Sequence, residues 1–395
     1  MVKPFRILTL NKISPAGLKR LPPERYVVGN EMAAPDAILV RSHDMHEMDI
    51  PVSVLAIARA GAGTNNVPVK KMNARGVPVF NAPGANANAV KELVLAGMLL
   101  AARNIVPALG FVAGLTEQGE ALHQAVEDGK KQFAGSELRG RTVGIVGLGA
   151  IGRLVADAAI GLGMRVIGYD PEITVDAAWS LPSQVKKAHS LEDLLKHSDY
   201  VTLHVPLLDA TRDLINAQRV AAMKSGAVLL NFARDGIVSE AAVLEGLARK
   251  HLRGYVCDFP SALLRGQPCV IALPHLGAST EEAEENCAVM VAEQLRDYLE
   301  HGNIRNSVNF PTLELPRGSA FRMSVAHANV PNMLGQISST LAAAGINISE
   351  MGNKSRGDMA YTLVDTDTPL SDALVAQVAA IPGVLAVRAL PLEAA

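Results

Sequence analysis

The chain has 395 residues, 49% of them hydrophobic, and its formal net charge at pH 7 is −2. This length allows two or three domains with sizeable cores, because single cores stop growing at about 250 to 300 residues. The charge balance, with no clustered basic patch, gives no electrostatic reason to expect nucleic acid or an anionic membrane as a partner.

Short β-rich runs open the chain, separated by polar or helix-compatible stretches. They are Arg6–Leu10, Ala37–Val40, Val54–Ala58 and Val77–Phe80. Strands that alternate with helices predict an α/β domain with a parallel sheet covered on both faces. Ligands of such sheets bind beyond the carboxyl ends of the strands. The turns at these ends therefore predict a substrate site built from Arg41, Ser42, Arg59, Gly61, Ala62, Gly63 and Asn86.

The two arginines in these turns favour an anionic substrate. Either Arg41 or Arg59 alone would be interpreted as a solvated surface side chain. Their position at successive strand ends, beside a pair of glycines, is what favours an anion site. An apolar helical pattern then runs from Ala89 to about Ala113 and predicts one long packed helix, followed by a polar approach over residues 129–139.

The next stretch combines a strand, a glycine loop and a helix. The apolar run Val143–Val146 predicts a buried strand, and a helical pattern covers Ala150–Leu162. Between them Gly147, Gly149 and Gly152 form a Gly-x-Gly-x-x-Gly pattern. Such glycines permit a tight turn, close approach of a pyrophosphate and close helix packing, with the phosphates at the positive end of the helix. The glycines alone would equally fit a flexible turn.

A second strand with an acidic end completes the dinucleotide pattern. Arg165–Tyr169 is followed by Asp170, 18 residues beyond Gly152. An acidic residue about 20 residues past the glycines binds the ribose hydroxyls of NAD. The whole arrangement predicts a Rossmann-type domain that binds NAD.

The α/β alternation continues beyond Asp170. Strands are predicted at Tyr200–His204, Ala227–Asn231 and Val270–Leu273, and helices at Thr211–Ala217 and Glu240–Lys250. Polar residues again follow the strands, and Arg234 and His275 are expected at the open nicotinamide end. A lone histidine after a strand would otherwise be interpreted as structural.

A long helix and a third unit follow. Ser279 and Glu282 form a capping box that opens an amphipathic helix ending at Gly302, which is expected to return the chain to the first domain. Residues 310–319 contain two prolines and predict a linker. Beyond it the order βαββαβ predicts a ferredoxin-like unit that is regulatory or oligomerising. Its strands are predicted at Phe321–Ala326, Ile346–Met351, Met359–Thr366 and Val384–Leu390, and its helices at Met333–Ala344 and Asp372–Ala380.

The cysteines, the apolar runs and the N-terminus indicate the cellular compartment of the protein. Cys257, Cys269 and Cys287 are odd in number and lack metal-ligand spacing, so neither a disulfide framework nor a metal site is expected. The run Leu93–Ala102 is shorter than the ~20 residues of a membrane span. The N-terminus has no signal-peptide core. We expect a cytoplasmic protein.

Three motifs together resemble the D-isomer-specific 2-hydroxyacid dehydrogenases. They are Gly-Leu-Gly-Ala-Ile-Gly at 147–152, Asn-Phe-Ala-Arg-Asp-Gly at 231–236 and Pro-His-Leu-Gly-Ala-Ser-Thr at 274–280. Within that family the likeness is to the branch that oxidises D-3-phosphoglycerate at the first step of serine biosynthesis. It implies a Rossmann domain at 85–283 inserted in a flavodoxin-like substrate domain at 1–84 and 284–312, a linker at 313–319 and an ACT domain at 320–395.

The resemblance also implies residue roles. Arg234 would bind the carboxylate and carbonyl of the substrate, and His275 would transfer the hydroxyl proton. Histidine titrates near working pH and arginine does not, which agrees with this division. The implied NAD contacts are Gly147, Gly149, Ala150, Ile151, Gly152, Asp170, His204, Val205, Pro206, Thr211, Ala233, Arg234, Asp258, His275 and Gly277.

One departure from the family pattern leaves alternatives open. The glutamate that pairs with the catalytic histidine is replaced by Ala262, so another carboxylate such as Asp258 orients His275, or the histidine works without a charged partner. This keeps open an NAD(H)-sensing regulator without catalysis. An unphosphorylated acid such as glyoxylate or hydroxypyruvate is a further alternative substrate.

The C-terminal unit is similar to ACT domains that hold serine. The matching positions, His327, Asn329 and Asn347, predict an effector site, although asparagines also cap turns in such units. Asn332 replaces a glycine of the serine-sensing members. A homodimer or homotetramer is expected.

Overall fold

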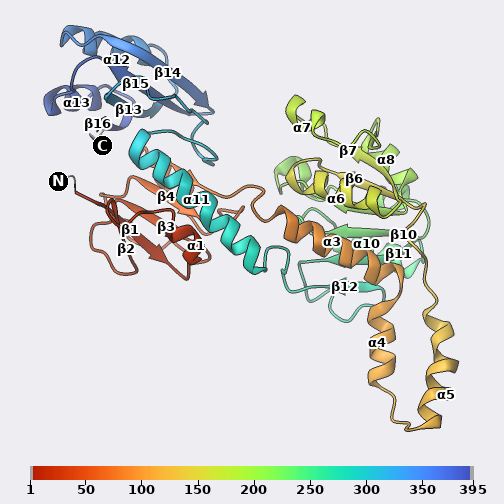
Figure 1. Ribbon diagram of the computed structural model, residues 1–395. Helices are drawn as coiled ribbons and strands as arrows, with labels where there is room; N and C mark the ends of the chain where they lie inside the picture. The colour runs from red at the N-terminus through yellow and green to blue at the C-terminus, as the bar shows by residue number, and fades with distance from the viewer. Residues whose placement is uncertain (1–2, 392–395) are drawn as a thin grey trace. The chain divides into compact units, whose positions relative to one another are not determined.

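The computed structural model describes residues 3–391, and the chain divides into two compact units. Unit 1 combines the residues up to Asn86 with those from Glu281 onward, and unit 2 is the segment Ala87–Thr280 inserted between them. The expected fold class is confirmed. Two parallel α/β sheets and a C-terminal antiparallel βαββαβ sheet make up the chain (Figure 1).

The first sheet of unit 1 is parallel and has the order β2-β1-β3-β4-β5. This is the strand order of flavodoxin-like sheets. Its elements are β1 (Phe5–Leu10), α1 (Pro15–Leu18), β2 (Tyr26–Gly29), β3 (Ala37–Val40), β4 (Ala56–Arg59), α2 (Val69–Asn73) and β5 (Val79–Phe80). All four side chains of β3 are buried, as expected for a central parallel strand. The edge strand β2 was not predicted, because its four residues carry too little periodic signal.

Helix α11 (Glu281–His301) packs on α1 and on the first sheet of unit 1. Its buried residues include Ala283, Cys287, Val291, Leu295 and Leu299, which recur every four positions and form one apolar face. Gly302, with φ +75°, ends the helix in the left-handed conformation that favours glycine.

The C-terminal sheet is antiparallel with the order β14-β15-β13-β16. Its elements are β13 (Phe321–Ala328), α12 (Met333–Ala343), β14 (Ile348–Arg356), β15 (Met359–Thr366), α13 (Asp372–Ala379) and β16 (Val384–Pro391). Strand β14 lies further along the chain than the predicted Ile346–Met351. Residues 392–395 of the predicted unit lie outside the described residues.

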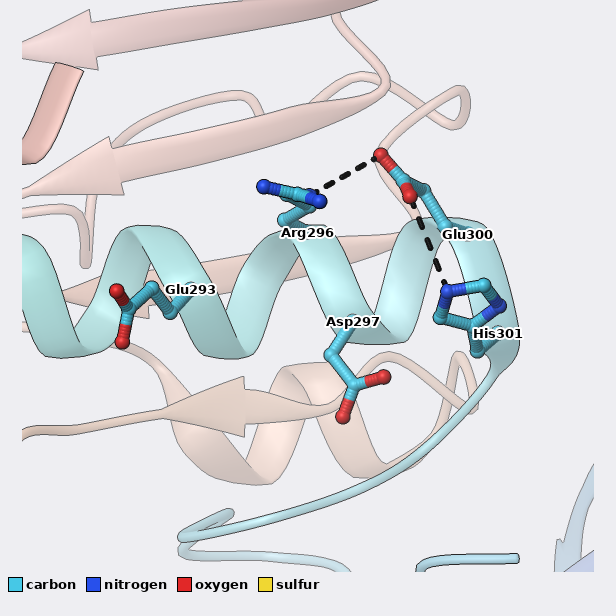
Figure 2. A pocket seen from close by; sticks show the side chains of 5 residues that line it. All are labelled: Glu293, Arg296, Asp297, Glu300 and His301. Carbon is cyan, nitrogen blue, oxygen red and sulfur yellow. Dashed lines mark ion pairs between the residues drawn. The ribbon is translucent and has the colours of Figure 1, made fainter. Parts of the chain in front are cut away.

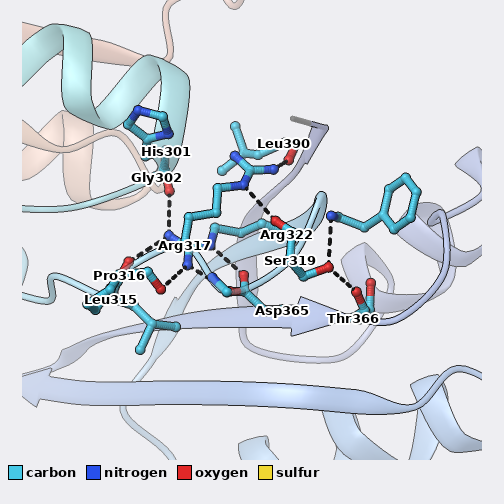
Figure 3. Close-up of polar contacts among 12 residues, drawn as sticks. His301, Gly302, Leu315, Pro316, Arg317, Ser319, Arg322, Asp365, Thr366 and Leu390 are labelled. Carbon is cyan, nitrogen blue, oxygen red and sulfur yellow. Dashed lines mark hydrogen bonds and ion pairs between the residues drawn. The ribbon is translucent and has the colours of Figure 1, made fainter. Parts of the chain in front are cut away.

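Arginines and a tyrosine from the linker and the C-terminal sheet cap the end of α11. Arg388 donates to the carbonyls of Tyr298 (3.2 Å) and Leu299 (2.8 Å), and Tyr361 donates to that of Gly302 (2.7 Å). Arg317 and Arg322 donate to the carbonyls of residues 300 and 301, as part of the network in Figure 3. The last carbonyls of a helix lack partners inside it, and the cap supplies donors to them, while the Tyr298 carbonyl also accepts a hydrogen bond from the Gly302 amide at 2.9 Å.

The sheet of unit 2 is parallel, with the order β12-β11-β10-β9-β6-β7-β8. From β6 the chain moves outward through β7 and β8, and then resumes on the other side at β9. The elements of this sheet are β6 (Thr142–Val146), α6 (Ala150–Gly161), β7 (Arg165–Tyr169), α7 (Val175–Trp179), β8 (Lys186–Lys187), α8 (Leu191–His197), β9 (Tyr200–Leu203), η2 (Asp209–Thr211), α9 (Ala217–Ala222), β10 (Ala227–Asn231), α10 (Glu240–Ala248), β11 (Leu252–Cys257) and β12 (Val270–Ala272).

Two helix predictions in unit 2 were wrong. The single helix from Ala89 to Ala113 is instead α3 (Ala87–Ala102) and α4 (Ile105–Ala113), bent by 66° at Asn104, whose φ is +51°. The helix predicted at Thr211–Ala217 is a turn, and α9 starts only at Ala217, where the Asn216 side chain caps it. Both errors arose where a polar residue interrupts an otherwise continuous helical pattern.

Helix α4 leads into an arm that extends from unit 2 (Figure 1). The arm continues through α5 (Glu120–Gly129) and η1 (Lys130–Phe133), and the rings of Phe111 and Phe133 pack 5.3 Å apart. In the part of the chain that the structure describes, no single helix is long and apolar enough to cross a membrane, and only the bent pair α3 and α4 meets the criteria of length and composition together.

Candidate functional site

The glycine loop lies at the point where the sheet of unit 2 reverses its strand order. A Cβ on Gly147 would lie 2.6 Å from the carbonyl oxygen of His204, and one on Gly152 would lie 2.0 Å from that of Gly147. Neither position therefore accepts a side chain. A Cβ on Gly149 would meet no atom within 4 Å. Gly149 also caps α6 without a side-chain hydrogen bond, so the open space adjoins the first amides of that helix and fits a pyrophosphate.

Asp170 is fixed beside this loop at the end of β7. Its two carboxylate oxygens accept hydrogen bonds from the amides of Leu148 (2.8 Å) and Glu172 (3.0 Å). The side chain is half-buried, and each oxygen keeps a further lone pair for another donor. A carboxylate held here fits the ribose hydroxyls of a dinucleotide.

His204 follows β9 on the other side of the loop. Its Nε2 lies 3.0 Å from the Thr202 hydroxyl, while its buried Nδ1 has no hydrogen-bond partner among residues 3–391. Burial lowers the pKa of the imidazole to about 3, so the ring is neutral at working pH. The Thr211 hydroxyl donates to the Pro206 carbonyl (2.6 Å) and holds the adjoining turn. A buried orphan nitrogen beside the glycine loop is consistent with a ligand that is bound there.

The His275 loop is held by Asp258 through the backbone. The carboxylate of Asp258, which is 1% exposed, accepts hydrogen bonds from the amides of Leu276 and Gly277, both at 2.7 Å. The His275 amide donates to the Asp258 carbonyl at 3.1 Å, and His275 has a φ of +57°. A non-glycine residue in this conformation is strained, and such strain is common at functional sites.

The imidazole of His275 is exposed, and its ring centroid lies 5.2 Å from that of Phe259. Ala262 lies in the turn after β11. Within the described chain no ion pair joins His275 to a carboxylate, and both oxygens of Asp258 bind amides instead. Asp258 therefore positions the loop and does not replace the missing glutamate at the ring.

Arg234 lies on a turn that Asn231 holds. Asn231, 2% exposed, accepts a hydrogen bond from the Ala233 amide (3.1 Å) and donates to the Arg234 carbonyl (2.9 Å). The Arg234 side chain is exposed and donates to the Ala233 carbonyl at 2.6 Å. The guanidinium thus stands at the carboxyl end of β10.

The predicted substrate turns of unit 1 are joined at the carboxyl ends of β3 and β4. Arg59 Nε donates to the Arg41 carbonyl at 3.0 Å, and its guanidinium lies over Gly61, where a Cβ would be 1.8 Å from Nη1. Asn81 donates to the Ala62 carbonyl at 2.6 Å. The amide of Ser42, whose side chain is exposed, donates to the Asn11 side chain at 3.1 Å. Gly63 and Asn86 are half-buried in the same unit.

Sequence reasoning missed Glu284, which pairs with Arg41 at 2.6 Å. The two residues are 243 positions apart. Glu284 belongs to the solvated, charged start of α11, a pattern that gives no sign of a partner in the turn after β3. Only the return of α11 onto the first sheet brings them together.

The predicted effector residues differ in their surroundings. His327 is 2% exposed, and its ring nitrogens lie 2.8 Å from the Ala328 carbonyl and 2.9 Å from the Thr362 hydroxyl. Asn329 and Asn347 are exposed, and Asn329 donates to the Gly357 carbonyl at 3.0 Å. Asn332 has a φ of +66°, a conformation that asparagine tolerates better than most residues. The effector site stays a prediction.

A shallow pocket of about 300 Å³ lies elsewhere, along the outer surface of α11 (Figure 2). Its lining residues are Glu293, Arg296, Asp297, Glu300 and His301. Glu300 accepts a hydrogen bond from the Tyr26 hydroxyl at 2.6 Å and pairs with Arg25 at 3.2 Å. None of the predicted site residues lines this pocket, and within it Glu300 pairs with Arg296 and His301.

Comparisons with known proteins identify the family of the chain. Residues 106–277 match the model of the D-isomer specific 2-hydroxyacid dehydrogenase, NAD binding domain. D-3-phosphoglycerate dehydrogenase of Haemophilus influenzae is 34% identical over 363 residues, which are 89% of this chain and 85% of the relative. The enzyme of the same name from Escherichia coli is 34% identical over 351 residues, 85% of this chain and 82% of the relative.

A solved structure gives the same result. The NAD⁺-bound 3-phosphoglycerate dehydrogenase of Entamoeba histolytica is 25% identical and superposes with a TM-score of 0.62 over 79% of this chain and 100% of that chain. The glycine loop, Asp170 and the strand order of unit 2 fit NAD as the cofactor. The chain belongs to the D-isomer-specific 2-hydroxyacid dehydrogenases and is an NAD-dependent enzyme of that family.

Proposed function

We propose that this dehydrogenase oxidises D-3-phosphoglycerate to 3-phosphohydroxypyruvate, the first step of serine biosynthesis. The observation that carries the proposal is the pair of arginines at the ends of β3 and β4, linked by the hydrogen bond from Arg59 Nε to the Arg41 carbonyl. Two guanidinium groups in adjoining turns suit a substrate that carries a phosphate as well as a carboxylate. Both relatives described above carry the name of this activity.

In this proposal the residues of unit 2 act on the reacting carbon. NAD held by the glycine loop and Asp170 would supply the acceptor for the hydride of C2. His275 takes the proton of the C2 hydroxyl as the carbonyl forms, because a neutral imidazole is a base near working pH. Arg234 holds the carboxylate and polarises the new carbonyl, since its guanidinium stays charged. Asp258 keeps His275 in position through the loop amides.

The test is steady-state reduction of 3-phosphohydroxypyruvate, hydroxypyruvate and glyoxylate with NADH, measured side by side. The proposal expects kcat/KM to be highest for the phosphorylated acid. Arg59→Gln should lower kcat/KM for that acid by roughly ten- to hundred-fold, because a charge-assisted hydrogen bond contributes about 1.5–3 kcal/mol. The loss should be smaller for hydroxypyruvate. Equal losses for both acids would contradict a phosphate site.

One observation favours the second candidate, an unphosphorylated 2-hydroxyacid. Glu284 already neutralises Arg41 in unit 1, which reduces the positive charge available to a phosphate. A higher kcat/KM for glyoxylate or hydroxypyruvate than for the phosphorylated acid would favour this substrate class.

For the C-terminal unit we propose control by an amino acid, with serine as the effector, and a homodimer or homotetramer as the assembly. The exposed side chains of Asn329 and Asn347 support an effector site, whereas the buried His327 supports the sheet. Titration of the dehydrogenase with serine tests the effector, and Asn347→Ala should abolish any inhibition. Light scattering tests the assembly.

A further inference from the structure

The anion site of unit 1 contains a carboxylate of its own. Glu284 Oε1 lies 2.6 Å from Arg41 Nη2, and the two side chains are 42% and 34% exposed. Arg41 is joined to Arg59 through the hydrogen bond to its carbonyl. The thiol of Cys287, one helical turn after Glu284, is buried, and the charged groups around it are Arg59, Arg41 and Glu284. These four residues form one cluster, which we call the arginine cluster.

Glu284 has a second source of stabilisation besides Arg41. It is one of three acidic residues in the first turn of α11, a helix of 21 residues. Carboxylates are stabilised near helix N-termini by the helix dipole. The negative charge of Glu284 therefore remains stabilised by the helix dipole when its ion pair with Arg41 breaks. Arg41 in turn becomes available to another anion.

We propose that Glu284 is a specificity-determining residue that occupies Arg41 as an internal competitor, and that the phosphate of the substrate displaces it. This inference rests on the proposed phosphorylated substrate. A phosphate monoester carries a charge of about −1.5 to −2 at pH 7, against −1 for the carboxylate. The phosphate dianion therefore displaces Glu284 from Arg41, whereas the neutral hydroxymethyl group of hydroxypyruvate does not. Weakly bound monoanions are kept off Arg41 by the same pair.

The strength of the pair fits such a role. Ion pairs between partly exposed side chains are weak and are screened by salt, so displacement is feasible for a dianion. Removing the competing charge should therefore tighten binding of a phosphorylated ligand by about two- to five-fold. Glutamine keeps an oxygen that accepts a hydrogen bond from Arg41, so Glu284→Gln removes the charge while the guanidinium keeps its orientation.

The experiment compares the full-length wild type with Glu284→Gln and with Glu285→Gln. Glu285→Gln is the matched control, because it removes the same charge from the next position of α11. KM and kcat are measured with NADH for 3-phosphohydroxypyruvate and hydroxypyruvate at low and high ionic strength. Glu284→Gln should lower KM for the phosphorylated acid about two- to five-fold with kcat nearly unchanged. Its KM for hydroxypyruvate should match that of the wild type, and high salt should reduce the difference.

A double-mutant cycle assigns the effect to Arg41. In an Arg41→Gln background, Glu284→Gln should no longer lower KM, because the guanidinium with which the Glu284 carboxylate pairs is absent. An unchanged or higher KM in Glu284→Gln, or an equal fall in Glu285→Gln, would overturn the proposal. Calorimetric measurement of 3-phosphoglycerate binding distinguishes a failure of the substrate assignment from a failure of the role proposed for Glu284. Lack of turnover in the wild type contradicts the substrate assignment, whereas the role of Glu284 stands only if Glu284→Gln binds that ligand more tightly.

Discussion

At the scale of single residues, Asp258 is a buried carboxylate in unit 2 that cannot be changed without leaving a hydrogen-bond donor unpaired. Its carboxylate is 1% exposed and binds two amides of the His275 loop. In Asp258→Asn one of these amides would face an NH₂ donor, and a buried unpaired donor costs about 1–3 kcal/mol. We expect a fall in kcat of roughly 10- to 100-fold through displacement of His275. Turnover within two-fold of wild type, at unchanged thermal stability, would show that the loop does not need this anchor.

His204 predicts a component of the acid sensitivity of the enzyme. Burial lowers its folded pKa to about 3, whereas an unfolded histidine titrates near 6.5. Between these values the unfolded chain binds more protons, so the stability of the fold decreases as pH falls from about 6.5 toward 3. Calorimetric unfolding at pH 7.5 and 4.5 should show a smaller loss of Tm in His204→Gln than in wild type. Equal losses would mean that the ring does not stay neutral in the fold.

At the scale of elements, the glycine loop allows a matched pair of substitutions. A Cβ at Gly152 would lie 2.0 Å from the Gly147 carbonyl oxygen, and one at Gly149 would meet no protein atom within 4 Å. Gly149→Ala should therefore fold normally and lose NAD affinity, because its methyl group enters the space of the pyrophosphate. Gly152→Ala should lose thermal stability in addition to NAD affinity, because its methyl group would push β6 and α6 apart. Thermal unfolding with and without NAD measures both effects, and equal stabilisation of Gly149→Ala and wild type by NAD would exclude this position for the phosphates.

The helices, strands and loops also show which parts of the fold can be predicted from sequence patterns. The strand, glycine loop and Asp170 were predictable because neighbours in the chain build them. The bend at Asn104 was not, because the apolar pattern continues on both sides of a residue in the left-handed conformation. The Glu284 partner of Arg41 could not be predicted either, since the two residues are 243 positions apart and meet only when α11 packs on the first sheet. Contacts within one motif follow from sequence, and contacts between distant elements need the fold.

At the scale of the whole molecule, α11 connects the first sheet of unit 1 with the C-terminal sheet. Its first turn carries Glu284 of the arginine cluster, and its last carbonyls are bound by Arg388 and by Arg317 and Arg322, the latter two shown in Figure 3. A change in the C-terminal sheet therefore has a direct structural connection to the substrate turns.

The last prediction concerns the ion pair that anchors this connection. Arg322 and Asp365 have fully buried side chains and are joined by two hydrogen bonds of 2.5 and 2.8 Å. Asp365→Asn leaves the guanidinium without a counter-charge, and breaking a buried pair costs about 3–5 kcal/mol. Asp367→Asn, two positions along and exposed, is the matched control. The amides of β13 and β15 should exchange with deuterium faster in Asp365→Asn only.

The pH dependence of this exchange gives an independent check. Burial acts to raise the pKa of the Asp365 carboxyl, but the hydrogen bonds from Arg322 and from the Gly318 amide outweigh it and hold that pKa below its usual value. The pair therefore stabilises the sheet above about pH 4, the pKa of an unfolded aspartate, and this contribution is lost as pH falls through the lower folded pKa. Relative to the intrinsic exchange rate of an unstructured amide, which itself falls with pH, protection of these amides in the wild type should decrease over that acid range and approach that of Asp365→Asn. The single tryptophan, Trp179, lies in unit 2, so mass spectrometry of β13 and β15 peptides is the suitable measurement. A variant and a wild type that exchange alike at pH 7 would show that the cap of α11, and not the ion pair, holds the sheet.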